Sequence, residues 1–235
     1  RIIWVETPSN PLLRVTDIRR VATIARECGA LLVVDNTFLT PLGQQPLDLG
    51  ADIVVHSTTK YINGHSDVVG GAVVARESEL LEQLAWWANC VGSTASPWDC
   101  SQVMRGLRTL HARLRCHEEN VAEVATALDG HPAVKQVNWP GLKSHPDHAL
   151  ATSQQDLFGA VVSFELEGGE EQVRAFLDGL KHFTLAESLG GVESLVCHPG
   201  SMTHAAMSEE AQAEAGISPT LLRLSVGIER AADLV

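Results

Sequence analysis

The stretch IVVHSTTKYINGHSDVVGG, residues 53–71, decides how the rest of the chain is interpreted. It opens with an apolar run typical of a strand buried on both faces, and it continues into a polar segment that contains Lys60. Most lysines are solvated, so Lys60 taken alone is a surface residue that ends a strand. The alternative is a desolvated amine that forms a Schiff base with a carbonyl compound. Only the residues around Lys60 can distinguish a solvated lysine from a nucleophilic one.

Composition narrows the class of protein. The chain has 235 residues, of which 45% are hydrophobic and 20% charged, as in a soluble globular protein of one large or two modest domains. Its formal net charge is -12 and it contains no basic run. This charge argues against nucleic acid and anionic membranes as partners. Small molecules are the expected partners.

Cysteine and histidine spacing gives no sign of a metal or of a disulfide framework. The five cysteines are scattered without a redox or zinc motif, so we interpret them as reduced thiols of a cytoplasmic protein. None of the ten histidines belongs to a two-histidine helical motif, and no catalytic metal is expected. We expect neither a membrane span nor a secretory signal. Because the chain opens on Arg1 directly in a strand-like run, we expect an upstream segment to be missing.

The first half of the chain alternates predicted strands and helices. Apolar spacing predicts a helix over 16–28, with Thr16 as N-cap and Gly29 at its end. Apolar runs predict strands over 2–5, 31–34 and 53–55. This alternation predicts a parallel sheet that binds ligands at the carboxyl ends of its strands, where Asp35 and Lys60 both fall.

The second half is predicted to be an α+β domain. A helix over 80–87 carries Trp86 and Trp87, which we interpret as core or interface residues. A long helix opens at Pro97 or Asp99, and looser apolar spacing near 116–120 suggests a boundary between domains 1–118 and 119–235. Beyond it we predict strands over 134–139, 160–166 and 221–226 and a helix over 171–180.

The polar residues at the strand ends suggest a cofactor. A carboxylate at the end of a buried strand, such as Asp35, needs a cationic or hydrogen-bond-donating partner, and a protonated pyridine nitrogen would serve. Ser57 and Thr59 could donate hydrogen bonds to a phosphate. Pyridoxal phosphate would satisfy these groups together with Lys60. Alternatively, Asp35 only forms a turn, and the hydroxyls of Ser57 and Thr59 bond to the backbone.

Four segments together carry a family resemblance: VVDNTF at 33–38, HSTTKYINGHSDVV at 56–69, AESLGGVESL at 186–195 and LLRLSVGIE at 221–229. They resemble the Cys/Met-metabolism family of pyridoxal-phosphate-dependent enzymes of fold type I, over essentially all 235 residues. The resemblance implies an α/β fold with a mostly parallel sheet and flanking helices. Residues 1–118 would be the C-terminal part of the cofactor-binding large domain, and 119–235 the smaller α+β domain.

The resemblance also implies the roles of residues near the cofactor. Lys60 would form the Schiff base with pyridoxal phosphate, and Asp35 would pair with the pyridine nitrogen. Ser57 and Thr59 would hold the phosphate. Asn10 would lie near the ring oxygen and the substrate carboxylate.

Three further residues would bind substrate. The resemblance makes Arg223 the arginine that grips the α-carboxylate, with Ser188 beside it. A guanidinium binds a carboxylate through two hydrogen bonds, although Arg223 could also be a strand arginine in a salt bridge. Glu187 would face the distal amino group of cystathionine, and its plainer interpretation is an exposed loop carboxylate.

The implied activity is γ-replacement, forming cystathionine from an O-acylhomoserine, O-succinylhomoserine by expectation, and cysteine in methionine biosynthesis. Elimination from cystathionine, O-acylhomoserine sulfhydrylation and a cofactor-free binding fragment stay open as alternatives. The resemblance implies a homotetramer built from dimers. The family's phosphate loop and stacking tyrosine have no counterpart here, since Tyr61 is the only tyrosine and follows Lys60 directly. The chain alone is expected to be inactive.

Overall fold

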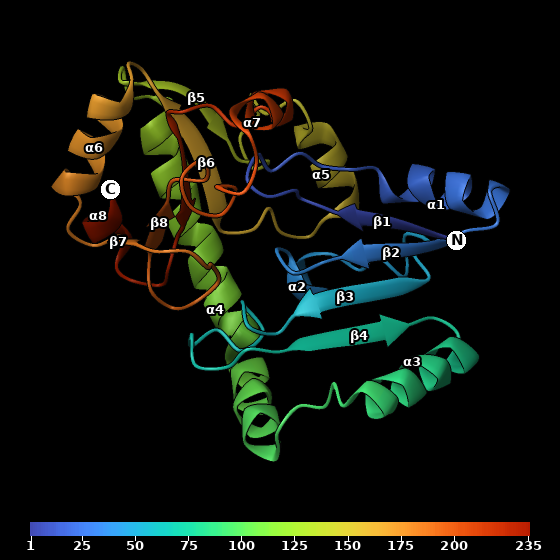
Figure 1. Cartoon of the computed structure of the whole chain (residues 1–235). Coiled ribbons are helices and arrows are strands. Elements are labelled where there is room, and N and C mark those ends of the chain that lie inside the picture. Colours follow the sequence, from blue (N-terminus) through green and yellow to red (C-terminus); the bar gives the residue numbers. More distant parts are fainter.

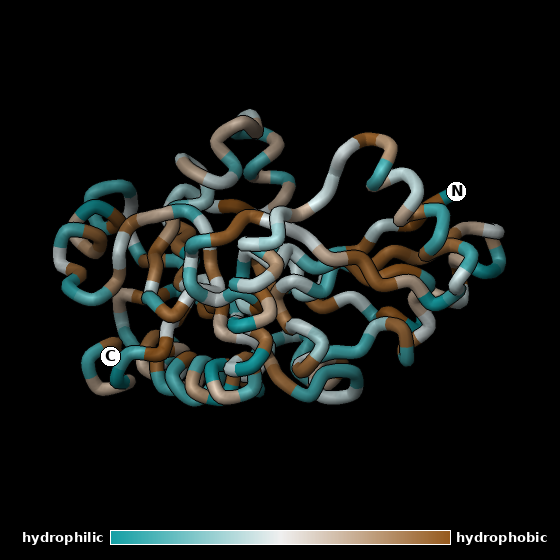
Figure 2. The backbone as a smooth tube through the Cα atoms, turned by 90° about the horizontal axis from the view of Figure 1, so that it is seen from below, coloured by the Kyte–Doolittle hydropathy of each residue, from teal (hydrophilic) through white to brown (hydrophobic).

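The computed structural model describes all 235 residues and contains two β-sheets connected by one long helix (Figure 1). The first sheet has four strands in the order β1-β2-β3-β4, and the second has five in the order β5-β6-β9-β8-β7. Brown, hydrophobic segments of the chain concentrate in the strands, whereas the outer helices are largely teal (Figure 2). Each sheet therefore supplies apolar surface to the interior of its half.

The first sheet contains the predicted parallel strands and one strand of opposite direction. The strands β1 (Ile2–Glu6), β2 (Leu31–Asp35) and β3 (Ile53–Ser57) are parallel, and their predicted positions are confirmed. The fourth strand, β4 (Gly71–Ala75), is not among the predicted strands, and it runs antiparallel to β3. The polar segment after β3 enters β4 beside the C-terminal end of β3, where Ser57 pairs with Gly71. The two strands therefore have to run in opposite directions.

Helix α1 (Ile18–Glu27) packs against one face of the first sheet. Its N-cap is Asp17 rather than the predicted Thr16, because the Asp17 carboxylate accepts a hydrogen bond from Arg20 N at 3.0 Å. Gly29 follows the helix with a φ of 59°, a conformation that glycine adopts without strain, as the helix-end prediction required. The buried residues of the helix form a cluster with β2 and its neighbours.

Helices α2 (Thr40–Gly43) and α3 (Ser78–Val91) follow β2 and β4. No residue of α3 is buried, and Trp86 and Trp87 are 58% and 59% exposed. The prediction that these tryptophans are core residues is therefore wrong for this chain. Their two rings contact each other edge to face at 4.8 Å. Their assignment to an interface stays a prediction.

Helix α4 (Pro97–Asp129) has 33 residues and runs without interruption through the predicted boundary at 116–120. It begins at Pro97, as predicted, with Ser96 as its N-cap. The looser apolar spacing has a local cause: buried polar side chains, His117 and Asn120 among them, occupy the inner face of the helix there. The division into domains at residue 118 stays a prediction.

The second sheet is antiparallel except for the short pair β7 (Thr184–Leu185) and β8 (Leu195–Cys197). The predicted strands are found as β5 (Val134–Asn138), β6 (Val161–Leu166) and β9 (Leu221–Ser225). The helices of this half are α5 (His148–Gln154), α6 (Glu170–Gly179), α7 (Glu209–Ala215) and α8 (Ala231–Leu234). All five residues of β9 are buried, so this strand lies at the centre of the core.

None of the helices is both long and apolar enough to cross a membrane.

Candidate active site

One cavity of about 310 Å³ lies beyond the carboxyl ends of β2 and β3, where an open α/β sheet binds its ligands. Seven of the eight predicted site residues line it: Asn10, Asp35, Ser57, Lys60, Glu187, Ser188 and Arg223. Thr59 does not. The other lining residues were not among the predicted site residues; they are Glu6, Thr37, Phe38, Leu189 and Thr203. The cavity therefore combines both halves of the chain.

Lys60 lies in a tight turn after β3, and its side chain points to the second half of the chain. Its Nζ donates a hydrogen bond to Ser188 Oγ at 2.8 Å. Burial lowers the pKa of the Lys60 ammonium, and the nearby Arg223 lowers it further, while Glu187 acts in the opposite direction. A lysine with a lowered pKa offers a larger fraction of neutral, nucleophilic amine.

Asp35 is held by Thr37, which the sequence analysis had left without a role. Its Oδ1 accepts hydrogen bonds from Thr37 N at 3.0 Å and from Thr37 Oγ1 at 2.6 Å. The same hydroxyl accepts a bond from Ser57 N at 2.8 Å, so it joins the ends of β2 and β3. A hydroxyl residue two positions after a strand-end aspartate was the available sequence signal. Asp35 Oδ2 makes no hydrogen bond within the chain and remains free for a donor.

Arg223 is only 2% exposed, and it has no carboxylate partner. Its Nη1 donates to Asn10 Oδ1 at 2.9 Å and its Nη2 to Ser188 O at 2.8 Å. Its Nε is buried without any partner. Burial lowers the pKa of this guanidinium. A buried cation with an unused donor favours an anionic ligand in the cavity, such as a carboxylate.

The segment 187–190 packs directly against the turn that contains Lys60. Ser188 has a φ of 90°, in the left-handed region that non-glycine residues seldom adopt. Gly190 has a φ of 78°, and a Cβ there would lie 2.7 Å from Tyr61 N. This close approach of two backbones requires glycine, and it brings Glu187 and Ser188 to the cavity.

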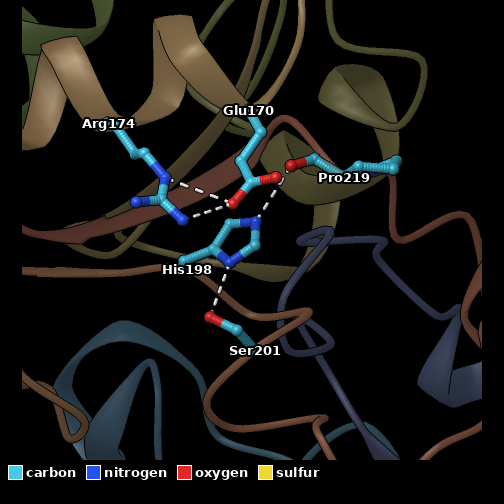
Figure 3. Close-up of polar contacts among 5 residues, drawn as sticks. All are labelled: Glu170, Arg174, His198, Ser201 and Pro219. Atoms are coloured by element: carbon cyan, nitrogen blue, oxygen red, sulfur yellow. Dashed lines mark hydrogen bonds and ion pairs between the residues drawn. The ribbon is translucent and has the colours of Figure 1, made fainter.

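Thr203 reaches the cavity from the loop that follows β8. His198 fixes the start of this loop: Nδ1 lies 2.7 Å from Ser201 Oγ and Nε2 lies 3.0 Å from Pro219 O (Figure 3). Because a carbonyl only accepts, Nε2 carries a proton, and in the neutral ring Ser201 donates to Nδ1. On the neighbouring α6, Glu170 pairs with Arg174 at 2.7 Å (Figure 3).

Thr59 is oriented differently from the other predicted phosphate ligand. Its hydroxyl donates to Gly70 O at 3.3 Å and accepts from Gly70 N at 3.0 Å. These bonds join the two ends of the segment between β3 and β4. They agree with the alternative that the Thr59 hydroxyl bonds to the backbone. Ser57, in contrast, lines the cavity.

A half-buried lysine after a parallel strand, beside an aspartate at the end of the neighbouring strand, defines a site of the type found in pyridoxal-phosphate-dependent enzymes. The chain belongs to the Cys/Met metabolism PLP-dependent enzyme family, whose model matches residues 1–235. The donor set fits this cofactor: an amine for its carbonyl, a free carboxylate oxygen for its ring nitrogen and a hydroxyl for its phosphate. The fold is the α/β fold of these enzymes.

Several characterised proteins are similar to the chain over its whole length. Cystathionine gamma-synthase of Escherichia coli is 53% identical, and cystathionine gamma-lyase of Bacillus subtilis is 51% identical. The matches cover 100% of this chain and 61% and 62% of those proteins. A crystal structure of cystathionine gamma synthase from Xanthomonas oryzae in complex with cystathionine superposes with a TM-score of 0.97 at 67% identity, covering 99% of this chain and 60% of that one. The chain thus spans about three fifths of the length of these relatives.

Proposed function

We propose that this chain is the larger part of an enzyme that forms cystathionine from O-succinylhomoserine and cysteine by γ-replacement. The observation that carries the proposal is the single cavity in which Lys60, Glu187 and Arg223 converge. In the reaction the bond between Cγ and the acyloxy oxygen breaks, the cysteine sulfur bonds to Cγ, and the carboxylate and a proton are released. Elimination from cystathionine is the second candidate, because relatives named gamma-lyases are 51% identical to the chain, against 53% for the Escherichia coli synthase.

The cofactor would be held by residues at the ends of β2 and β3. Lys60 would form the Schiff base with pyridoxal phosphate, and the free oxygen of Asp35 would accept from the protonated pyridine nitrogen. Ser57 would contact the phosphate, and Asn10 the ring oxygen; Thr59 would join Ser57 only by exchanging its bonds to Gly70 for the phosphate. When bound, the cofactor withdraws electrons from the substrate α-carbon. The Lys60 amine, freed when the amino group of the substrate takes its place on the cofactor, would then remove the α-proton, and burial lowers the pKa of this amine.

The substrate would be oriented by three residues of the second half. Arg223 would bind the α-carboxylate with its unused Nε and a second nitrogen, in a two-bond geometry that lysine cannot reproduce. Ser188 would contact the same group. Glu187 would face the distal amino group of cystathionine, because a carboxylate at that end of the cavity complements an ammonium.

Assembly, domain organisation and cellular role follow from the same proposal. The enzyme would act in the cytoplasm, in methionine biosynthesis, as a homotetramer built from dimers. Residues 1–118 would belong to the cofactor-binding large domain and 119–235 would form the small domain. The exposed pair Trp86 and Trp87 would then lie in an interface.

The test is Lys60→Ala in the intact protein. Borohydride reduction of the wild type should fix pyridoxal phosphate to the peptide that contains Lys60, as mass spectrometry would show. The variant should lose this adduct and at least about 10³-fold in turnover. Turnover of O-succinylhomoserine with cysteine, compared with cystathionine alone, separates the synthase from the lyase. A wild-type adduct on any other lysine would refute the assignment.

A further inference from the structure

Arg113 on α4 is a second buried arginine, and it has no role in the site described above. The side chain is 5% exposed, and all its hydrogen bonds go to neutral acceptors. Its Nη1 donates to Tyr61 O at 2.8 Å, and its Nη2 donates to Gly106 O at 2.8 Å and to Ile62 O at 3.4 Å. Its Nε donates to Thr109 Oγ1 at 3.1 Å. No carboxylate pairs with it.

Two of the three carbonyls that it binds, those of Tyr61 and Ile62, belong to the turn that contains Lys60. Within this turn Asn63 N donates to Thr58 O at 3.0 Å and Gly64 N donates to Lys60 O at 2.7 Å. No backbone amide donates to the carbonyls of Tyr61 and Ile62. Arg113 supplies donors to these two carbonyls, which would otherwise be buried without a partner.

Two glycines make this contact possible. A Cβ at Gly64 would collide with the Arg113 guanidinium, and a Cβ at Gly106 would collide with the carbonyls of Ile62 and Asn63. The turn therefore lies directly on the backbone of α4. The ring of Tyr61 also contacts His117 of α4, edge to face at 5.3 Å, and on the other side of the turn Gly190 approaches Tyr61 N. The residue after Lys60 is thus held from both sides.

Burial of the Arg113 guanidinium without an anion is unfavourable for the stability of the fold. A buried guanidinium loses its hydration and gains no anion here to offset that cost. The guanidinium of Arg113 does, however, fix the geometry of the Lys60 turn. It fixes two consecutive carbonyls next to Lys60, whose Nζ then meets Ser188 Oγ at 2.8 Å.

We infer that Arg113 is a positioning residue that holds the backbone of the Lys60 turn so that the Lys60 amine is directed into the active-site cavity. The inference rests on the proposed function of Lys60. Arg113 itself lines none of that cavity. It acts through the peptide groups of Tyr61 and Ile62, and its removal should change the reactivity of the amine rather than the binding of the carboxylate substrate.

The experiment compares Arg113→Met and Arg113→Lys with Leu114→Ala in the intact protein. Leu114 is the next residue on α4 and is buried in the core, so its truncation is a matched control for lost stability. Two quantities are measured: the rate at which cofactor-free protein takes up pyridoxal phosphate on Lys60, and the pH dependence with which acetic anhydride labels Lys60, followed by mass spectrometry. The labelling needs no cofactor.

Arg113→Met should slow cofactor uptake by about 10- to 100-fold, since misplacement of a reacting group by about 1 Å has effects of this size. The labelling midpoint of Lys60 should shift as well. Arg113→Lys should recover part of the rate, because an ammonium reaches one carbonyl in place of two. Leu114→Ala should lose stability and keep the wild-type rate and midpoint.

The inference is overturned if Arg113→Met loses stability yet labels and takes up cofactor like the wild type, or if Leu114→Ala slows uptake equally. Should Arg113→Met fail to fold, Arg113→Lys decides, and a wild-type rate and midpoint in that variant would refute the inference. If the wild type forms no cofactor adduct on Lys60, the proposed function fails. The labelling comparison between wild type and variants then still tests Arg113.

Discussion

Glu118 should make the stability of the protein depend on pH in a direction opposite to that of most carboxylates. This side chain on α4 accepts hydrogen bonds from Phe158 N at 2.7 Å and from Gly159 N at 3.1 Å. Burial raises its pKa from 4.5 to about 7, and the two amide donors only partly offset this effect. The folded protein therefore holds a proton on Glu118 across a pH range in which the unfolded chain has lost it.

The size of the effect follows from the shift. Raising the pKa from 4.5 to about 7 corresponds to about 3 kcal/mol, at 1.36 kcal/mol per unit. Because the folded state binds more protons between these values, the contribution of Glu118 to stability falls as pH rises. The stabilising contribution is complete below pH 4.5 and has been lost above about pH 7. The slope is at most about 1.4 kcal/mol per pH unit.

Glu118→Gln removes the titration and keeps the shape of the side chain. The amide accepts only one of the two backbone bonds well, which costs about 1–3 kcal/mol at every pH. The informative quantity is therefore the change with pH: from pH 4.5 to pH 8 the variant should gain about 3 kcal/mol relative to the wild type. Urea unfolding followed by tryptophan fluorescence at half-unit pH steps measures it. Parallel curves for the two proteins would refute the reasoning.

Two further predictions concern the cavity. Asp35→Asn should reduce turnover by at least about 10²-fold with a smaller change in KM, because an amide stabilises a protonated pyridine nitrogen less than a carboxylate does; an unchanged rate of α-proton exchange with deuterium oxide would contradict this. Arg223→Lys should weaken binding of carboxylate substrates by about 10- to 100-fold, since one point charge replaces a two-bond contact. Titration calorimetry with an unreactive amino acid measures it, and wild-type affinity would rule out the carboxylate contact.

The parts of the fold that apolar patterns encode were predictable from the sequence. The strands that begin at residues 2, 31 and 53 open with continuous apolar runs, those that begin at 161 and 221 are mostly apolar, and all five lie where expected. Strand β4 was missed because the glycines and hydroxyl residues before it resemble a loop, and its direction depends on a return path that no local pattern encodes. The two tryptophans of α3 were predicted to lie in the core or in an interface, and only the core alternative is wrong, because aromatic side chains indicate burial without indicating the partner.

The candidate site was predictable where a residue has a distinctive chemical reason to be present. Lys60 and Asp35 stand at strand ends, and Arg223 stands between leucines in a buried strand. Thr37 and Thr203 were missed, since a single hydroxyl residue in a loop is common. The contact of Arg113 with the Lys60 turn was also out of reach, because it joins residues 52 positions apart through backbone carbonyls, which are the same in every sequence.

The bond from Arg223 to Asn10 joins residues 213 positions apart, and it has a consequence for biosynthesis. At about 5–20 residues per second, a ribosome needs about 10 to 40 s to pass from one to the other. During that interval Lys60 has already been made, while Ser188 and Arg223 have not. A nascent chain therefore exposes the Lys60 amine before the partners of that amine exist. If Lys60 binds the cofactor as proposed, Ser188 and Arg223 can contribute to the site only after the last strand has been added.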